Sequence, residues 1–307
     1  MPTDVNKLKE NYKFTVCTPC YNSASFISRV FKSLNNQTYK NFEWYVINDA
    51  STDNTHELIS EFIKDVEFEV VYHNLNKNQG LHNNINQAIK DASGDFFVLY
   101  GHDDEMLPEA LSTFNEVLIN NDSSMISAVY ALANDQDQKL VGKKYPKDLL
   151  ISDYWTQMFA LENSEEKFQC FKTQYLREFY PLNTSKDEGV ISAWLWGMLG
   201  VKYKAIFINK VLRVYYTNVE TSITSTAKRD NNPIAVFNYY RYWVNKFQYF
   251  IKGNLKRKLR GIGGYISYGL LANKNFLEII KPIERLSNKL IILFFYPIAK
   301  IYNIIKK

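Results

Sequence analysis

One stretch decides the fold of this chain: Gly94-Asp-Phe-Phe-Val-Leu-Tyr-Gly-His-Asp-Asp-Glu105. Its five consecutive apolar or aromatic residues, 96–100, predict a strand that is covered on both faces. Because water does not reach such a strand, acids at its end must be exposed in a crevice or be compensated by other charges. In an open parallel sheet, ligands bind in the crevice beyond the carboxyl ends of the strands.

The acids at the end of this stretch have two interpretations. Clustered carboxylate oxygens suit Mg²⁺ or Mn²⁺, and such an ion in turn suits a diphosphate. Alternatively, Asp104 and Glu105 precede Pro108 and lie in a solvated loop, where they favour the dipole of the following helix. The segment alone does not choose between these two interpretations.

Strands and helices are expected to alternate along the first half of the chain. The hydrophobic patterns predict strands at 14–18, 42–48, 67–72, 95–100 and 125–132, and helices at 24–36, 53–64, 80–91 and 107–120. This order is typical of an α/β fold with a mostly parallel sheet and helices on both of its faces.

The second half has a less regular pattern. Residues 134–165 are polar and are expected to form a loop over a site or a variable insertion. A helix is expected at 187–200, followed by two strands, 204–208 and 211–216, joined by a turn at Asn209-Lys210. From about 232 the chain becomes helical, aromatic and basic.

Composition indicates a protein of a reducing compartment. With 46% hydrophobic residues, the chain can bury a large core. Its three cysteines, Cys17, Cys20 and Cys170, are too few for a disulfide framework. The polar residues 1–10 do not resemble a signal peptide, so we expect a cytoplasmic protein.

Charge is distributed unevenly, although the net charge is only +5. Residues 251–307 hold 12 Lys or Arg and 2 Glu, a net of +10, which leaves −5 for the rest. A basic tail predicts an anionic partner. We expect an anionic membrane surface rather than nucleic acid, because the main body is acidic and has no nucleic-acid recognition motif.

The last apolar segment, 290–305, is interrupted by Pro297 and Lys300. It is too short and too broken to span a bilayer, which takes about 20 apolar residues. We therefore expect it to lie in the membrane interface, and a core helix packed on the main domain is the alternative.

Two further strand ends carry polar groups that suit a nucleotide. The first is Thr18-Pro-Cys-Tyr-Asn22, where Pro19 is expected to fix a turn. The second is Asn48-Asp-Ala-Ser-Thr-Asp-Asn-Thr55, where Asp49 follows a strand directly and can accept from a base N–H or a ribose hydroxyl. Neither a G-x-G-x-x-G nor a P-loop motif is present, which argues against dinucleotide-binding and P-loop folds.

Taken together, these motifs resemble the inverting glycosyltransferases of family 2. Residues 18–22 resemble that family's T-P-x-Y-N, residues 48–55 its D-D-G-S-T-D-x-T, and Asn78-Gln-Gly80 with Asn86 its N-x-G…N element. Ser93-Gly-Asp95 and Asp103-Asp104 resemble its glycine-acid and D-x-D-D elements. The four motifs follow one another in the family's order and spacing across residues 14–120.

The resemblance implies a GT-A fold, a nucleotide-sugar donor, usually a UDP-sugar, and Mn²⁺ or Mg²⁺. It places a glycosyltransferase domain at 1–230, with a nucleotide-binding half at about 12–133 and an acceptor half at about 134–230. A helical, basic and aromatic region at 231–307 then follows. It assigns the metal to Asp103, and nucleotide-sugar binding to these residues: Thr18, Pro19, Tyr21, Asn22, Asp49, Ser51, Asn78, Gly80 and Asp104.

This chain departs from the family pattern in two places. Gly101 stands where the family usually has Asp, so Asp103 is expected to carry the metal alone, with His102 as a possible extra ligand or a bystander. Asn48 stands where many members have Asp, but its side chain also accepts hydrogen bonds.

An inverting transfer needs one general base to take the proton of the acceptor hydroxyl. Lys186-Asp-Glu-Gly189 resembles the acidic motif with which the family supplies this base. We favour Glu188 over Asp187, and an ordinary acidic start of the following helix is the alternative.

The resemblance therefore implies a hexosyl- or N-acetylhexosaminyl-transferase. We expect it to use a saccharide acceptor, lipid-linked, in cell-surface polysaccharide synthesis, and to be peripheral on the inner face of the membrane. The missing carboxylate at Gly101 motivates an alternative, a non-catalytic nucleotide-sugar-binding or scaffold protein.

Overall fold

The computed structural model describes residues 11–182, 193–216, 233–251 and 255–305. The chain divides into two compact units that interleave along the sequence. The sheet unit comprises Met1–Ser152, Ser164–Tyr180 and Tyr203–Val219, and the helical unit comprises Asp153–Asn163, Pro181–Lys202 and Glu220–Lys307. The domain boundaries expected from the sequence remain a prediction.

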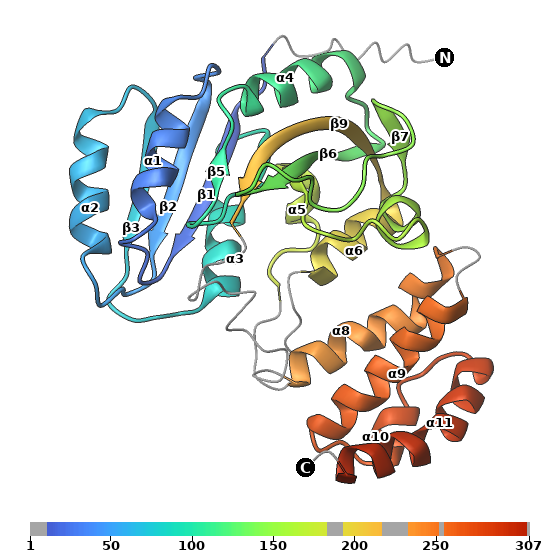
Figure 1. Cartoon of the computed structure of the whole chain (residues 1–307). Helices are drawn as coiled ribbons and strands as arrows, with labels where there is room; N and C mark the ends of the chain where they lie inside the picture. The colour runs from blue at the N-terminus through green and yellow to red at the C-terminus, as the bar shows by residue number, and fades with distance from the viewer. Residues whose placement is uncertain (1–10, 183–192, 217–232, 252–254, 306–307) are drawn as a thin grey trace. The chain divides into compact units, whose positions relative to one another are not determined.

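The sheet unit is built on one mixed sheet, with strand order β3-β2-β1-β4-β8-β6-β9-β5 and with β7 paired to β9 (Figure 1). The strands are β1 Phe14–Cys20, β2 Phe42–Asn48, β3 Glu69–Asn74, β4 Phe96–Leu99, β5 Glu105–Met106, β6 Ile126–Asp135, β7 Leu150–Ser152, β8 Phe168–Lys172 and β9 Lys204–Tyr215. The first four strands of this order are parallel, as predicted. Strand β8 then runs antiparallel between β4 and β6, so the second half of the sheet is mixed.

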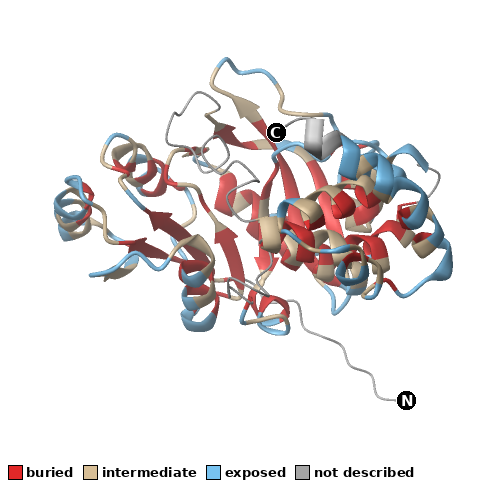
Figure 2. Ribbon diagram, turned by 90° about the horizontal axis from the view of Figure 1, so that it is seen from below, coloured by how far each residue is buried: buried red, intermediate tan, exposed pale blue. Residues whose placement is uncertain are grey.

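Helices cover both faces of the parallel strands. They are α1 Ile27–Asn35, α2 Thr55–Phe62, α3 Leu81–Asp91, α4 Ala110–Asn121 and α5 Thr173–Arg177. Because side chains alternate along a strand, Phe14 and Val16 of β1 share one face, where they pack with apolar residues of α1, α2 and α4. Helix α3 contacts β1 and buries Ile85 and Ile89, which do not belong to that cluster. Strands β1, β2 and β4 are accordingly buried, β3 is partly exposed, and the helices have exposed outer surfaces (Figure 2).

Strand β1 is longer than predicted and includes Pro19, where the sequence predicted a turn. The last bond between β1 and β4 runs from Tyr100 N to Cys17 O. In a parallel ladder the backbone groups of Pro19 face the same side as those of Cys17, where β4 has already ended. The missing N–H of proline therefore costs no ladder bond, and the strand continues to Cys20 beside β2.

The predicted strand pair at 204–208 and 211–216 is wrong, because β9 is one continuous strand. Asn209 does not form a turn. Its Oδ1 accepts from Tyr145 N, and its Nδ2 donates to Tyr145 O. Its own N–H donates to Asp148 Oδ1 at 2.7 Å. Lys210 Nζ donates to Thr113 Oγ1 at 2.7 Å. Since both polar residues find partners outside the strand, the chain runs straight on, with register irregularities against β6.

The predicted loop at 134–165 also contains regular structure. Strand β6 extends to Asp135, β7 pairs with β9, and Thr156–Ala160 forms a π-helical turn. These short elements lack the long hydrophobic period that marks a strand or helix in a sequence.

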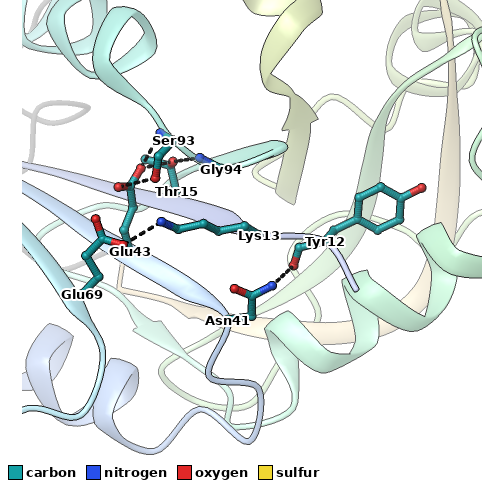
Figure 3. A network of polar contacts seen from close by, with 8 residues as sticks. All are labelled: Tyr12, Lys13, Thr15, Asn41, Glu43, Glu69, Ser93 and Gly94. Carbon is teal, nitrogen blue, oxygen red and sulfur yellow. Dashed lines mark hydrogen bonds and ion pairs between the residues drawn. The ribbon is translucent and has the colours of Figure 1, made fainter. Parts of the chain in front are cut away.

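A network of polar residues closes the amino ends of the parallel strands (Figure 3). The buried carboxylate of Glu43 accepts hydrogen bonds from Thr15 Oγ1, Ser93 N and Ser93 Oγ. Gly94 N donates to Thr15 Oγ1 at 2.9 Å, and a Cβ atom on Gly94 would lie 2.4 Å from Thr15 N. This amino-end network (Thr15, Glu43, Ser93 and Gly94) fixes where β4 begins, and it needs glycine for the close approach.

The helical unit contains α6 Ala193–Lys202, α8 Pro233–Asn245, α9 Leu255–Leu271, α10 Phe276–Ile280 and α11 Leu286–Ile305. Its core is aromatic and includes Trp155, Trp243, Phe247 and Tyr265. Helix α9 packs against both α8 and α11. None of the helices in the described ranges is long and apolar enough to cross a membrane.

Candidate functional site

The carboxyl ends of β2, β1 and β4 are neighbours, because β1 pairs in parallel with both other strands. The polar segments after these three strands therefore leave the sheet at one edge. The sequence placed candidate residues in all three segments, and the hydrogen bonds between the segments define the site.

Asn22 joins the segment after β1 to the segment after β2. It has a left-handed backbone, with φ 51°, a conformation that Asn tolerates better than most residues. Its N–H donates to Ser51 Oγ at 2.9 Å, and its Oδ1 accepts from Thr52 N at 2.8 Å. Asp53 adds a second link, since its Oδ2 accepts from Ala24 N at 3.0 Å and its Oδ1 from Thr55 N at 3.1 Å.

Asp49 is buried and holds the 78–80 turn in place. Its two carboxylate oxygens accept from Gln79 N at 2.7 Å and from Gly80 N at 2.8 Å. Asn78 Nδ2 donates to the Asp49 carbonyl at 3.1 Å, and Gly80 adopts φ 86°, which favours glycine. The structure thus brings the predicted ligand Asp49 together with two others, Asn78 and Gly80, which lie about thirty positions further along the chain. Each carboxylate oxygen keeps a second lone pair for another donor.

Thr18 and Tyr21 differ in accessibility. Thr18 is fully buried, and its Oγ1 accepts from Trp44 Nε1 at 3.1 Å, so its side chain serves the packing of β1 on β2. Tyr21 is 48% exposed and is accessible to a ligand. The assignment of both residues to nucleotide binding remains a prediction.

His102 links the end of β4 to the end of β1. Its ring is buried and bonds the Pro19 carbonyl, and Nε2 has no hydrogen-bond partner among the described residues. The bond to Pro19 therefore comes from Nδ1, which must carry its proton. Burial lowers the pKa of His102, while the neighbouring Asp103 acts to raise it.

Asp104 is tied to β9 by a buried ion pair. Its Oδ2 lies 3.0 Å from Arg213 Nη2, and both side chains are less than a tenth exposed. Arg213 also reaches Glu166 at 3.6 Å and donates to the Lys167 carbonyl at 3.4 Å. Burial raises the pKa of Asp104 to about 6, although the guanidinium of Arg213 acts to lower it. Asp104 is thus a charge-compensated group at the edge of the site.

Asp103 differs from Asp104 in having no hydrogen bond or ion pair from its carboxylate to any residue in the described ranges. Only its backbone is fixed, because Arg29 Nη1 donates to the Asp103 carbonyl at 2.7 Å. The same guanidinium lies 3.6 Å from the ring centre of Tyr216, which continues from β9. Helix α1 and β9 therefore hold the segment in place while the Asp103 side chain stays available.

Gly101 makes room for both carboxylates. A Cβ atom at this position would lie 2.8 Å from Asp104 Oδ2 and 3.0 Å from Asp103 Oδ1. An aspartate here would bring a third negative charge against these two oxygens. The glycine is therefore compatible with this arrangement of Asp103 and Asp104, and it leaves one accessible carboxylate rather than two.

Sequence reasoning missed Arg29, Arg213 and Tyr216. Arg213 did carry a signal, since it interrupts the apolar run Val211-Leu-Arg-Val214 of a strand, and a buried Arg needs a partner. Its partner lies more than a hundred residues away in the sequence, so no local pattern identifies it.

The predicted base residues, Asp187 and Glu188, lie outside the described residues. Cys17 and Cys20 are buried free thiols whose pKa values are raised by burial, so they stay protonated and do not act as a redox pair. No group of three or more His, Cys, Asp or Glu side chains suited to a metal occurs in the part of the chain that the structure describes.

Comparison with known proteins agrees with the motifs. A sequence model of the family called Glycosyl transferase family 2 matches residues 15–179, which is more than half of the chain. A GalNAc(5)-diNAcBac-PP-undecaprenol beta-1,3-glucosyltransferase of Campylobacter jejuni is 29% identical over 227 residues, covering 71% of this chain and 69% of that protein. Two other bacterial relatives are much longer, and the matched parts span 17% and 24% of their lengths.

Solved structures share the fold at low sequence identity. Staphylococcus aureus TarS 1–349 in complex with UDP-GlcNAc has a TM-score of 0.58 and 15% identity, over 95% of this chain and 89% of that chain. A mannosyltransferase of Pyrobaculum calidifontis in complex with GDP-Man and Mn²⁺ has a TM-score of 0.59 and 16% identity, over 94% and 81%. The family model confirms the predicted family, and the solved structures confirm the GT-A type of α/β fold.

Proposed function

This chain belongs to glycosyl transferase family 2, and we propose that it moves a sugar from a nucleotide-sugar to a lipid-linked saccharide in cell-surface polysaccharide synthesis. The donor is a UDP-sugar, the transfer is inverting, and Mn²⁺ or Mg²⁺ assists it. The enzyme works as a peripheral protein at the inner face of the membrane, and its basic C-terminal region meets the anionic lipid there.

One observation carries this proposal: polar segments from three adjacent parallel strands meet at one edge of the sheet, and Asp103 is the acid there without a described partner. Ligands of open α/β sheets bind at this edge. Asp49 and the 78–80 turn supply further polar groups beside it. Tyr21 supplies an exposed aromatic ring on which the nucleobase of the donor can stack.

The residues present fit a divalent cation that the donor brings with it. Mg²⁺ in such enzymes is held by one or two carboxylates together with substrate phosphates and water. Asp103 is the carboxylate that would hold it, and the unpartnered His102 Nε2 lies next to it in the chain. A complete protein cage is not needed, which agrees with the lack of a three-ligand group among the described residues. The bound ion would neutralise the charge that develops on the leaving diphosphate.

The chain's own residues have three tasks in the transfer. Asp49, Asn78 and Gly80 hold the nucleotide end of the donor, and Asn22 with Ser51 shapes the wall beside it. Asp104 stays locked to Arg213, so it fixes the position of its neighbour rather than binding the ion. Glu188 takes the proton from the acceptor hydroxyl as that oxygen attacks the anomeric carbon, with Asp187 beside it.

The donor and acceptor classes rest on the relatives. The Campylobacter protein is named for the transfer of glucose to an undecaprenol-linked saccharide, and TarS was solved with UDP-GlcNAc. The mannosyltransferase was solved with GDP-Man, so a donor series must include both nucleotides.

A donor screen tests the proposal. The purified chain is incubated with Mn²⁺ and UDP-, GDP- or dTDP-sugars, with an undecaprenyl-diphosphate saccharide as acceptor, and release of the nucleotide diphosphate is followed. We expect one UDP-sugar to be turned over, and Glu188→Gln to abolish transfer without loss of donor binding. The matched control is Glu162→Gln, which removes one carboxylate from an exposed position.

Two outcomes would contradict the proposal. Full transfer by Glu188→Gln would refute that residue as the base. Tight UDP-sugar binding with metal, but no turnover with any acceptor or by hydrolysis, would favour the non-catalytic binding protein.

A further inference from the structure

Helix α11 presents an apolar face on the side opposite to its packed face, with Ser287 as the one polar residue inside it. The packed face includes Ile292, which is fully buried, and Asn288, whose Nδ2 donates to Val244 O at 3.1 Å and to Tyr249 Oη at 2.8 Å. The apolar face comprises Leu286, Leu290, Leu293, Phe294, Pro297, Ile298 and Ile301. The six of these other than the proline are each 54–71% exposed.

We propose that this α11 apolar face lies flat on an anionic membrane surface and inserts its Leu, Ile and Phe side chains between the lipid headgroups. The inference deepens the proposed function, on which its purpose rests, because it names the surface that brings the enzyme to a lipid-linked acceptor.

Helical geometry supports a flat orientation. At 3.6 residues per turn, the seven positions of the α11 apolar face fall within an arc of about 140°, and no charged residue lies inside it. Ile292, near the centre of the opposite arc, is buried and packs α11 onto the helical unit. The exposed arc is therefore not part of the core. Scattered exposed apolar residues are normal on a protein surface, whereas a stripe along about four turns marks an interaction site.

The charges next to this face are complementary to anionic lipid. Lys289 and Lys300 fall within about 40° of the edge of the arc, where their amino groups can reach phosphates while their stems lie along the apolar surface. Helix α11 contains no Asp or Glu at all. Of the two acids in 251–307, Glu278 is engaged by Lys274 at 3.2 Å and by the cap of α10.

Crossing the bilayer is excluded for this helix by its sequence and its packing. Pro297 and two lysines interrupt its apolar stretch, one side of it is covered by the helical unit, and no described helix meets the requirement for a membrane span. An amphipathic helix with a basic margin binds in the plane of the interface instead.

A second copy of the chain fits this face less well. In an antiparallel two-fold pair the same patch meets itself edge to edge, so the lysine margin of one helix would approach the lysine margin of the other. Like charges across an interface oppose association, whereas a layer of anionic headgroups attracts both lysines.

Vesicle flotation with the full-length protein tests this inference. Wild type is mixed with vesicles of phosphatidylcholine alone or with added phosphatidylglycerol, and the floated fraction is measured. We expect wild type to float with the anionic vesicles, and Leu290→Glu/Phe294→Glu to reduce the partition coefficient at least about tenfold. The matched control, Met125→Glu/Leu149→Glu, adds the same charge at exposed apolar positions of the sheet unit and should float like wild type.

A second variant separates charge from apolar insertion. Lys289→Gln/Lys300→Gln should weaken flotation with anionic vesicles several-fold, and added salt should do the same to wild type. Thermal melting of each variant checks that it is folded, which we expect because all four side chains are partly or largely exposed.

The inference is overturned if wild type stays unbound with anionic vesicles, or if Leu290→Glu/Phe294→Glu floats as well as wild type. A dimer in light scattering that this double variant dissolves, without any flotation, would assign the face to self-association instead. Flotation does not depend on turnover, so failure of the donor screen would refute the proposed function and leave this result standing.

Discussion

The two ends of the parallel strands carry similar acids and use them in different ways. At the amino ends, the Glu43 carboxylate is enclosed by three donors from Thr15 and Ser93. At the carboxyl ends, Asp103 has no partner among the described residues, and Asp49 accepts only from the backbone of one turn. An acid at the end of a buried strand is therefore not by itself a ligand.

The difference teaches that partners, not residue type, separate structural from available acids. A buried carboxylate with several hydrogen bonds is held in one position by its donors. Asp104 lies at the functional edge but resembles Glu43, because Arg213 and burial enclose it. Its neighbour Asp103, by contrast, has no carboxylate partner among the described residues, as the proposed metal ligand requires.

The largest effect is expected from opening the ion pair behind the site. Arg213→Met would leave the Asp104 carboxylate buried without its partner, which costs about 3–5 kcal/mol. Urea denaturation at neutral pH measures the loss. Arg213→Met/Asp104→Leu should recover most of it, since apolar side chains of similar size replace such pairs at little cost.

A surface pair provides the control for this experiment. Lys64→Met breaks the Lys64–Glu61 pair, whose side chains are 67% and 71% exposed, and should cost less than about 0.5 kcal/mol. Equal losses in Lys64→Met and Arg213→Met would show that Asp104 is not enclosed, and the contrast with Asp103 would disappear.

The next effect concerns activity rather than stability. Asp103→Asn should lower metal-dependent donor turnover about a hundredfold, or about 2.7 kcal/mol, because the amide oxygen carries no charge for the cation. The urea midpoint should stay near that of wild type. Asp137→Asn, an acid 64% exposed in another loop, is the control. Unchanged turnover in Asp103→Asn would remove the metal assignment.

Two glycines allow a direct comparison of the two ends. Gly94→Ala would force a Cβ atom to 2.4 Å from a backbone nitrogen of β1, so we expect a loss of about 1–3 kcal/mol in unfolding free energy. Gly101→Ala meets two carboxylate oxygens, at 2.8 and 3.0 Å, rather than backbone. Asp103 can turn away and Asp104 need move only slightly within its ion pair, so the stability loss should be smaller.

The loss of turnover should be larger in Gly101→Ala than in Gly94→Ala, the opposite of the order expected for stability. Gly101→Ala displaces the oxygen atoms of Asp103 and Asp104, whereas Gly94→Ala changes the far end of the sheet. Specific activity of the folded fraction and urea denaturation are measured side by side. A greater stability loss in Gly101→Ala than in Gly94→Ala would contradict the distinction between the tightly packed amino ends and the accessible carboxyl ends of the strands.

The smallest effect is expected at Asp53, whose carboxylate accepts hydrogen bonds from Thr55 N at the start of α2 and from Ala24 N. Asp53→Ala should cost about 1 kcal/mol at pH 7, because Thr55 N loses its capping partner. Burial acts to raise the pKa of Asp53, but the hydrogen bonds from Thr55 and Ala24 outweigh it and lower the pKa below 3.8.

The pH dependence of this variant follows from that direction. A lowered native pKa stabilises the fold above the unfolded-state value and loses this contribution as the pH falls through the native value. The difference between wild type and Asp53→Ala should therefore shrink below pH 3.8. A difference that grows on acidification would show that the carboxylate is not stabilised as an anion.

Much of the fold was readable from local patterns. A run of apolar residues followed by acids at 94–105 marked a buried strand and its exposed end, and the alternation of periods predicted the parallel half of the sheet. The end of β4 could be located because its apolar run stops at Tyr100 and acids follow from Asp103. The motifs at 18–22, 48–55 and 78–80 then placed most of the candidate site, since each lies next to a strand end.

The tertiary structure alone decided which of these residues meet and which are free. Arg213 reaches Asp104 across more than a hundred positions, and Glu43 finds Ser93 across fifty. Sheet order creates these pairs: β8 enters antiparallel between β4 and β6, and β9 continues through Asn209 because distant residues satisfy its polar groups. The hydrophobic period of a sequence indicates which face of a helix or strand is buried, but it does not identify the residues that pack against that face. For this reason the sequence determined where the acids of the site lie, and only the folded chain determined that Asp103 is the one without a partner among the described acids at this edge of the sheet.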